Sequence, residues 1–255
     1  MPLGALGSRL EERLKSRSAT VGVVGLGYVG LPLAVAFAHA GFRVIGVDAD
    51  PSRTTLLAGG VSPVEDVPAA ELAPLVQSGR LAIHSSSDAL GEADAIVICV
   101  PTPLGKSKEP DISFIVAAAD GVARVLRPGT LVVLESTTYP GTTDEVLLPR
   151  MSRGGLRVGE EFFLGFSPER IDPGNQTWGL SRIPKVVGGV TPVCRHLIET
   201  LYRQIIDRVV PVSSTQVAEP RFARAGDHRG LPGPRRARPR GGRARRTGGP
   251  ARTAR

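Results

Sequence analysis

The chain contains few cysteines and no long hydrophobic run. Its two cysteines are Cys99, inside an apolar run over residues 95–100, and Cys194, in a predicted helix. This pattern predicts packed thiols and no disulfide framework. No stretch of 18 apolar residues occurs, and residues 3–15 mix Arg and Glu with Leu at helical spacing, unlike a signal peptide. We therefore expect a globular cytoplasmic protein without a membrane partner.

Lysine is missing from the last part of the chain. Residues 221–255 contain twelve Arg, one Asp and a single aliphatic core-forming residue, Leu231, whereas residues 1–220 hold 20 Lys plus Arg and 23 Asp plus Glu. The basic character of the chain therefore belongs to its end. A segment rich in Gly, Pro and Arg buries too little apolar surface to offset its chain entropy. We expect a disordered Gly/Pro/Arg-rich tail over residues 220–255.

One alternative for this tail is nucleic-acid binding, because arginine-rich segments bind phosphate backbones through counterion release. The tail lacks the interleaved aromatic residues that would stack on bases. We favour a different interpretation, in which a GC-rich coding region is translated in a shifted frame after Glu219. Nucleic acid is then not an expected partner.

Short β-branched runs alternate with helical patterns up to residue 219, which is typical of a parallel sheet joined by crossovers. The predicted fold is α/β, a doubly wound parallel sheet of the Rossmann type. We expect a helical extension over residues 1–16, a nucleotide-binding domain over 17–211 and the start of a truncated linker helix over 212–219. The predicted strands cover residues 20–24, 43–47, 81–84, 95–100, 131–135, 162–166, 185–187 and 208–211, and the predicted helices cover 30–40, 51–58, 68–77, 112–126, 142–149 and 192–206.

A glycine-rich segment joins the first predicted strand to the first predicted helix of this domain. Its glycines are Gly25, Gly27 and Gly30, in the spacing Gly-x-Gly-x-x-Gly. In a dinucleotide site Gly25 permits the tight turn, Gly27 lets backbone amides approach the pyrophosphate, and Gly30 lets helix and strand pack closely. Asp48 ends the second predicted strand, where a carboxylate can accept hydrogen bonds from the adenosine ribose. The pattern predicts a bound dinucleotide.

Asp48 also favours NAD over NADP. A 2′-phosphate would bring like charge against the carboxylate, at a cost of roughly 4 kcal/mol per unit charge at about 4 Å and an effective dielectric constant of about 20. Arg53 leaves three roles open: an ion pair with Asp50, support for a cofactor phosphate, or solvation.

Six motifs, the first of which contains this glycine segment, occur in order over residues 17–219. They are VGLGYVGLP at 24–32, VPTP at 100–103 with Pro110-Asp111, ESTTYPGTT at 135–143, FSPERIDPGN at 166–175, IPKVVGG at 183–189 and VSSTQVAE at 212–219. In these motifs the chain resembles the nucleotide-sugar 6-dehydrogenases, which oxidise a UDP-sugar alcohol to a uronic acid with two NAD. The form Pro-Glu-Arg-x-x-Pro-Gly at 168–174 resembles the branch that acts on UDP-N-acetylhexosamines.

The resemblance implies roles for individual residues of the cofactor site. Tyr28 and Val29 join the glycines in holding NAD, with Asp48 and Arg53 at the adenosine end. Thr102 contacts the cofactor. Thr137 also lies at the cofactor and holds a water or the reacting oxygen.

For the substrate, the resemblance implies that Glu169 and Arg170 face the UDP-sugar. Glu169 would work with the water held by Thr137 as an acid/base or orienting group, which suits a step in which a proton leaves the sugar alcohol. Residue chemistry alone leaves alternatives. They are helix capping for the hydroxyls of residues 136–143, a segment that includes Thr137 and precedes a helix, and a surface ion pair for Glu169 and Arg170. No metal site is predicted.

Two segments of the family pattern are absent from the 255 residues. The family continues after Glu219 with a helix carrying Lys-Leu-x-x-Asn, and later with Gly-Gly-x-Cys-x-Pro-x-Asp, whose cysteine is the nucleophile; here Pro220 follows, and Cys194 lacks that context. We therefore expect a catalytically incomplete dehydrogenase with an impaired family homodimer. The alternatives are a non-catalytic NAD-binding module and a relative of UDP-glucose 6-dehydrogenase.

Overall fold

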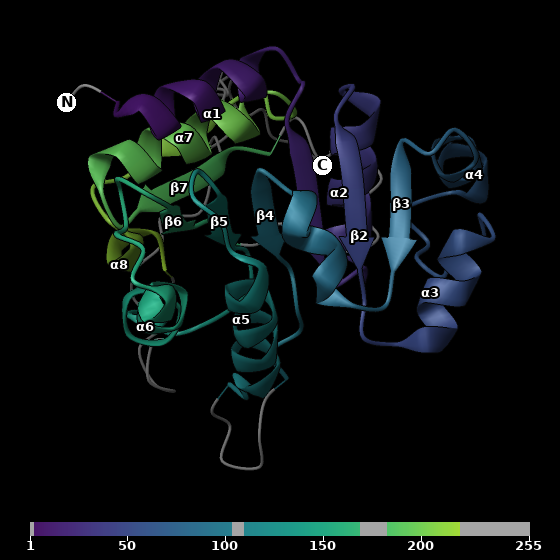
Figure 1. Ribbon diagram of the computed structural model, residues 1–255. Coiled ribbons are helices and arrows are strands. Elements are labelled where there is room, and N and C mark those ends of the chain that lie inside the picture. The colour runs from purple at the N-terminus through teal and green to yellow at the C-terminus, as the bar shows by residue number, and fades with distance from the viewer. Residues whose placement is uncertain (1–2, 104–109, 169–182, 220–255) are drawn as a thin grey trace, which may run out of the picture. The chain divides into compact units, whose positions relative to one another are not determined.

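The computed structural model describes residues 3–103, 110–168 and 183–219, and within them eight strands form one sheet (Figure 1). The strand order is β3-β2-β1-β4-β5-β6-β7-β8. The strands are β1 (Thr20–Val24), β2 (Arg43–Val47), β3 (Leu81–His84), β4 (Ala95–Ile98), β5 (Leu131–Leu134), β6 (Phe163–Phe166), β7 (Lys185–Gly189) and β8 (Val209–Pro211). The order 3-2-1-4-5-6 of the first six is that of the doubly wound nucleotide-binding fold, so the predicted fold class is confirmed.

The helices follow the predicted positions closely. They are α1 (Ala5–Lys15), α2 (Gly30–His39), α3 (Pro51–Ala58), α4 (Ala69–Gln77), α5 (Ser113–Val125), α6 (Leu148–Met151), α7 (Pro192–Tyr202) and α8 (Thr215–Ala218). The helix predicted over residues 142–149 differs: a π-helical turn, Thr142–Leu147, leads into α6. Pro149 is accommodated because it lies in the first turn of α6, where a backbone N–H has no partner within the helix.

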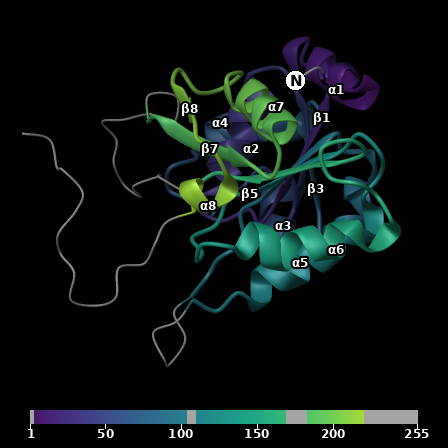
Figure 2. The same ribbon diagram turned by 90° about the vertical axis from the view of Figure 1, so that its left-hand side faces the viewer.

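Two hydrophobic cores lie on the two faces of the sheet. Alternate strand residues point to opposite faces, so Val21 and Val23 join the core shared with α1, α2 and α7, while Val24 joins the core shared with α5 and α6. Figure 2 shows α1 and α7 together on one side and α5 and α6 on the other. Because both faces are covered, the central strands consist almost entirely of apolar residues.

The sheet differs from the all-parallel prediction at one place. β6 and β7 pair antiparallel, with Gly165 opposite Gly189 and Phe166 opposite Gly188, and the other neighbouring strands pair parallel. An apolar run predicts a buried strand but carries no information on its direction. The approach is also close, since a Cβ at Gly165 would lie 2.2 Å from the Gly188 carbonyl oxygen.

The helix predicted at the N-terminus packs against the sheet domain. Glu11 of α1 and His196 of α7 are joined by a hydrogen bond of 2.8 Å, and Arg13 of α1 pairs with Asp94 beside β4 at 2.5 Å. The two helices lie side by side in both views (Figures 1 and 2).

The domain boundaries at residues 16, 211 and 219 stay predictions, and the tail lies outside the described residues. Within the described ranges, no helix combines the length and apolarity needed to cross a bilayer.

Candidate cofactor site

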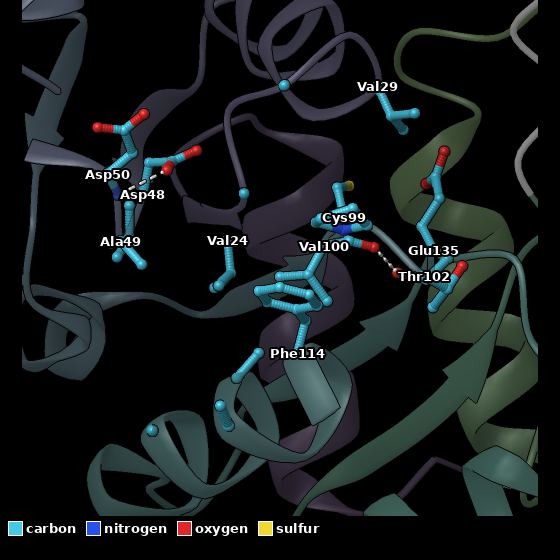
Figure 3. A pocket seen from close by; sticks show the side chains of 18 of the residues that line it. Val24, Val29, Asp48, Ala49, Asp50, Cys99, Val100, Thr102, Phe114 and Glu135 are labelled. Carbon is cyan, nitrogen blue, oxygen red and sulfur yellow. Dashed lines mark hydrogen bonds between the residues drawn. The ribbon is translucent and has the colours of Figure 1, made fainter. Parts of the chain in front are cut away.

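A cavity of about 570 Å³ opens at the carboxyl ends of the central strands. Figure 3 shows Asp48 and Asp50 on one side of it and Thr102 and Glu135 on the other. This is the position where open α/β sheets bind ligands, beside the point where the strand order reverses between β1 and β4. The predicted residues that line it are Gly25, Gly27, Tyr28, Val29, Asp48, Arg53, Thr102 and Thr137. The fold thus brings together residues that lie up to 112 positions apart in the sequence.

The three glycines of the loop have different surroundings. Gly25 has a φ of +89°, and a Cβ there would lie 2.7 Å from the Cys99 carbonyl oxygen. A Cβ at Gly30 would lie 1.8 Å from the Gly25 carbonyl oxygen. At Gly27 a Cβ would have no protein atom within 4 Å. Gly25 and Gly30 are therefore required by the fold itself, whereas the space beside Gly27 belongs to the cavity.

Asp48 is buried and fixed by three donors. Its Oδ2 accepts from Leu26 N at 2.7 Å and from Arg53 Nη1 at 3.0 Å, and its Oδ1 accepts from Asp50 N at 2.9 Å. An ionised carboxylate has about four acceptor positions, so one remains for a ribose hydroxyl. The carboxylate also ties the glycine loop to the end of β2.

Arg53 pairs with Asp48 and not with Asp50, so the ion pair considered from the sequence has a different partner. Its support for a cofactor phosphate stays a prediction, and its side chain lines the cavity. The carboxylate of Asp50 accepts from Ser52 N at 2.9 Å and Arg53 N at 3.4 Å, which caps α3. The Arg53 guanidinium pairs with Asp48, on the cavity wall.

Thr137 is an exposed residue between the buried Ser136 and Thr138, and it lines the cavity. Ser136 Oγ donates to the Val100 carbonyl oxygen at 2.8 Å, which ties the loop after β5 to the loop after β4 that carries Thr102. Thr102 and Thr137 therefore come from two loops that are linked directly. Helix capping, the alternative role for Thr137, is not among its side-chain contacts, and the helical segment that starts at Thr142 has no cap from its own N-cap residue.

The sequence reasoning missed a buried ionic cluster at the end of β5. Glu135 is 1% exposed, accepts hydrogen bonds from Lys185 Nζ and Tyr202 Oη, and lines the cavity. A charge directly after the apolar run Leu131–Leu134 is a signal of a functional or paired position. Nothing in the local sequence indicates its partners, which lie 50 and 67 residues away.

Two predicted site residues and one cysteine need separate mention. Glu169 and Arg170 lie outside the described residues. Cys194 is fully buried, and its Sγ accepts from Leu164 N at 3.3 Å and from Thr191 Oγ1 at 3.1 Å, as expected of a packed thiol. Across the described ranges, no group of His, Cys, Asp and Glu side chains is arranged to hold a metal ion.

The sequence profile of the UDP-glucose/GDP-mannose dehydrogenase family, NAD binding domain, matches residues 19–206. UDP-N-acetyl-D-glucosamine 6-dehydrogenase of Pseudomonas aeruginosa is 41% identical over 201 residues, which are 78% of this chain and 47% of that protein. UDP-N-acetyl-D-mannosamine dehydrogenase of Escherichia coli K12 is 38% identical over 210 residues, 79% of this chain and 49% of that one.

Solved structures agree with these relatives. The UDP-D-ManNAc dehydrogenase of Pyrococcus horikoshii has a TM-score of 0.73 at 33% identity, covering 78% of this chain and 48% of that chain. This chain spans about half the length of the curated relatives that it matches. NAD is the cofactor of the domain, and the open space beside Gly27 and the fixed carboxylate of Asp48 suit a dinucleotide. The chain belongs to the UDP-glucose/GDP-mannose dehydrogenase family through its NAD-binding domain.

Proposed function

We propose that the cavity holds NAD with its adenosine at Asp48, its diphosphate at the glycine loop and its nicotinamide near Thr102 and Thr137. The observation that carries this proposal is the free space beside Gly27, at the loop that opens α2. The first amides of a helix have no partner within it, so they attract a diphosphate. Asp48, with one acceptor position left, suits a ribose hydroxyl.

The experiment is calorimetric titration of NAD into the wild type and into Gly27→Val. A valine side chain at residue 27 meets no protein atom near its Cβ, so the variant should fold, yet it fills the space that the diphosphate needs. We expect NAD binding in the wild type and none in the variant, with equal thermal midpoints. Equal affinity of the two folded proteins would reject this cofactor pose.

We further infer that the chain carries the cofactor-binding half of a UDP-N-acetylhexosamine 6-dehydrogenase. The relatives support this substrate class, since one is a UDP-N-acetyl-D-glucosamine 6-dehydrogenase and another a UDP-N-acetyl-D-mannosamine dehydrogenase. Bound NAD would accept the hydride. Thr137 would hold the reacting oxygen or a water at the nicotinamide end, and Glu169 and Arg170 would face the sugar.

The same resemblance supports a dimer as the family's assembly, and we infer that dimerisation is weak in these 255 residues. Val217 on α8 is 60% exposed, but a single exposed apolar side chain is common on monomers and is far smaller than the surface that a stable dimer buries. Light scattering should therefore give a monomer or a mixture that grows with concentration. A single stable dimer across a wide concentration range would contradict this.

A further inference from the structure

We propose that Glu219 is a positioning residue that holds the Thr137 loop against the cofactor, an inference that rests on the NAD pose proposed above. The loop in question covers residues 136–143. Glu219 lies at the end of the segment that follows β8, 76 residues beyond Thr143, and no part of it lines the cavity. Its effect on the cofactor would therefore act through the loop alone.

Within the described residues, the side-chain hydrogen bonds of Glu219 all go to this loop. The side chain is 2% exposed, its Oε2 accepts from Gly141 N, and its Oε1 accepts from Thr143 N at 2.8 Å and from Thr143 Oγ1 at 2.7 Å. A second link runs in parallel, because Thr215 Oγ1 donates to Asp144 Oδ2 at 2.7 Å. Hydrogen bonds to an ionised acceptor are roughly twice as strong as neutral ones.

The loop needs an external partner because it cannot satisfy these donors itself. Gly141 has a φ of +98° and no side chain, so the helical turn that starts at Thr142 lacks a cap from its preceding residue. The first amides of such a turn require acceptors from elsewhere. Glu219 accepts from one of these amides, Thr143 N, and from the N–H of Gly141, the residue before the turn.

The restraint at Gly141 and Thr143 reaches Thr137 through a short chain of hydrogen bonds. Thr138 Oγ1 lies 2.6 Å from Thr142 Oγ1, which donates to the Tyr139 carbonyl oxygen at 2.8 Å. On its other side Thr137 follows Ser136, which is tied to Val100. Thr137 thus lies on a stretch fixed at both ends, and Glu219 fixes one of them.

The test compares NAD with ADP as ligands of the same variants. ADP has the adenosine and diphosphate but no nicotinamide, so it should not depend on the Thr137 loop. In Glu219→Gln one carboxylate oxygen becomes an amide NH₂ that faces an N–H donor. We expect NAD to bind about tenfold more weakly, ADP within about twofold of wild type, and faster amide exchange over residues 136–143.

Thr143 supplies a second, smaller change. Thr143→Val removes only the hydroxyl donor and should lower the affinity for NAD several-fold. Thr143→Ser keeps the hydroxyl and should have the wild-type affinity. Glu71→Gln, the same charge change at an exposed residue of α4, is the matched control and should change neither ligand. If Glu219→Gln does not fold, the two Thr143 variants carry the test.

The outcomes separate the two proposals. A wild type that binds ADP but not NAD, or neither, overturns the NAD pose, and the role of Glu219 falls with it. The second case is a wild type that binds NAD, together with Glu219 and Thr143 variants that have the same ratio of NAD to ADP affinity. This result overturns the role of Glu219 alone. An equal loss of both ligands in Glu219→Gln also overturns it, because it indicates general loss of structure.

Discussion

Single residues of the cofactor site differ in what they contribute. Gly25 and Gly30 are confined by neighbouring backbone, so they serve the fold, whereas Gly27 leaves space that only a ligand fills. Asp48 serves both, because it fixes the glycine loop through Leu26 N and presents its remaining acceptor position to the cavity. The glycines of this one motif are therefore present for two physical reasons: close backbone packing in the fold, and space for a ligand.

The charge of Asp48 predicts the choice between NAD and NADP. The wild type should bind NAD far more tightly, because a 2′-phosphate would lie against a buried carboxylate. Asp48→Asn should lower the affinity for NAD and bring the affinities for NAD and NADP closer together, as measured by calorimetry. Asp88→Asn, an exposed aspartate that does not line the cavity, should leave the ratio unchanged. A preference for NADP in the wild type would contradict this reasoning.

At the scale of elements, two clusters of charged side chains join parts of the chain that the hydrophobic cores do not specify. Glu135, Lys185 and Tyr202 connect β5, β7 and α7 beneath the cavity. Glu11, Lys15 and His196 connect α1 to α7 at the surface. The first cluster is removed from water and the second is not, so their contributions to stability should differ strongly.

Removing the lysine of the buried cluster should be costly. Lys185→Met leaves the Glu135 carboxylate with its buried charge unpaired, and we expect a loss of about 3–5 kcal/mol in the free energy of unfolding. Urea denaturation measures it. Arg203→Met, which breaks an exposed pair with Glu199, should cost less than about 1 kcal/mol. If the additional change Glu135→Gln recovers none of the loss, the unpaired charge is not its cause.

The surface cluster should give a pH-dependent contribution. The hydrogen bond from Lys15, and then that from His196, lowers the pKa of Glu11 below its ordinary value of 4.5. A lowered folded pKa means that the stabilisation is present above 4.5 and is lost as the pH falls through the folded value. Urea midpoints of the wild type and Glu11→Gln should therefore differ near neutral pH and converge below that value. A difference in urea midpoint that grows as the pH falls would contradict this role of Glu11.

At the scale of the whole molecule, the described residues form a complete nucleotide-binding sheet, while the chain covers about half of each relative's length. Cofactor binding requires only the residues of the cavity. Two-step oxidation of a sugar alcohol to the acid through a covalent intermediate needs, in addition, a nucleophile, which the family resemblance implies is a thiolate. Cys194 is packed under β6 and does not line the cavity.

These 255 residues by themselves should therefore bind NAD without oxidising a UDP-sugar. The measurement is NADH absorbance with UDP-N-acetylglucosamine, UDP-N-acetylgalactosamine and UDP-glucose in turn, and we expect no turnover. Turnover at roughly 1 per second or faster would contradict the prediction. Cys194→Ala would then show whether that thiol acts as the nucleophile, since loss of activity in this variant requires it.

The sequence by itself determined the elements and the centre of the site. The predicted strands over residues 20–24, 43–47 and 81–84 agree with β1, β2 and β3 to the residue, because apolar periodicity, turn glycines and helix caps act between near neighbours. The Gly25–Gly30 loop and Asp48 were identifiable for the same reason: each follows a strand directly. Only the tertiary structure decided the direction of β7, the pairing of Arg53 with Asp48, and the partners of Glu135 and Glu219. Those partners lie 50 to 78 residues away, and a hydrogen bond across that separation depends on where the folded sheet places each side chain.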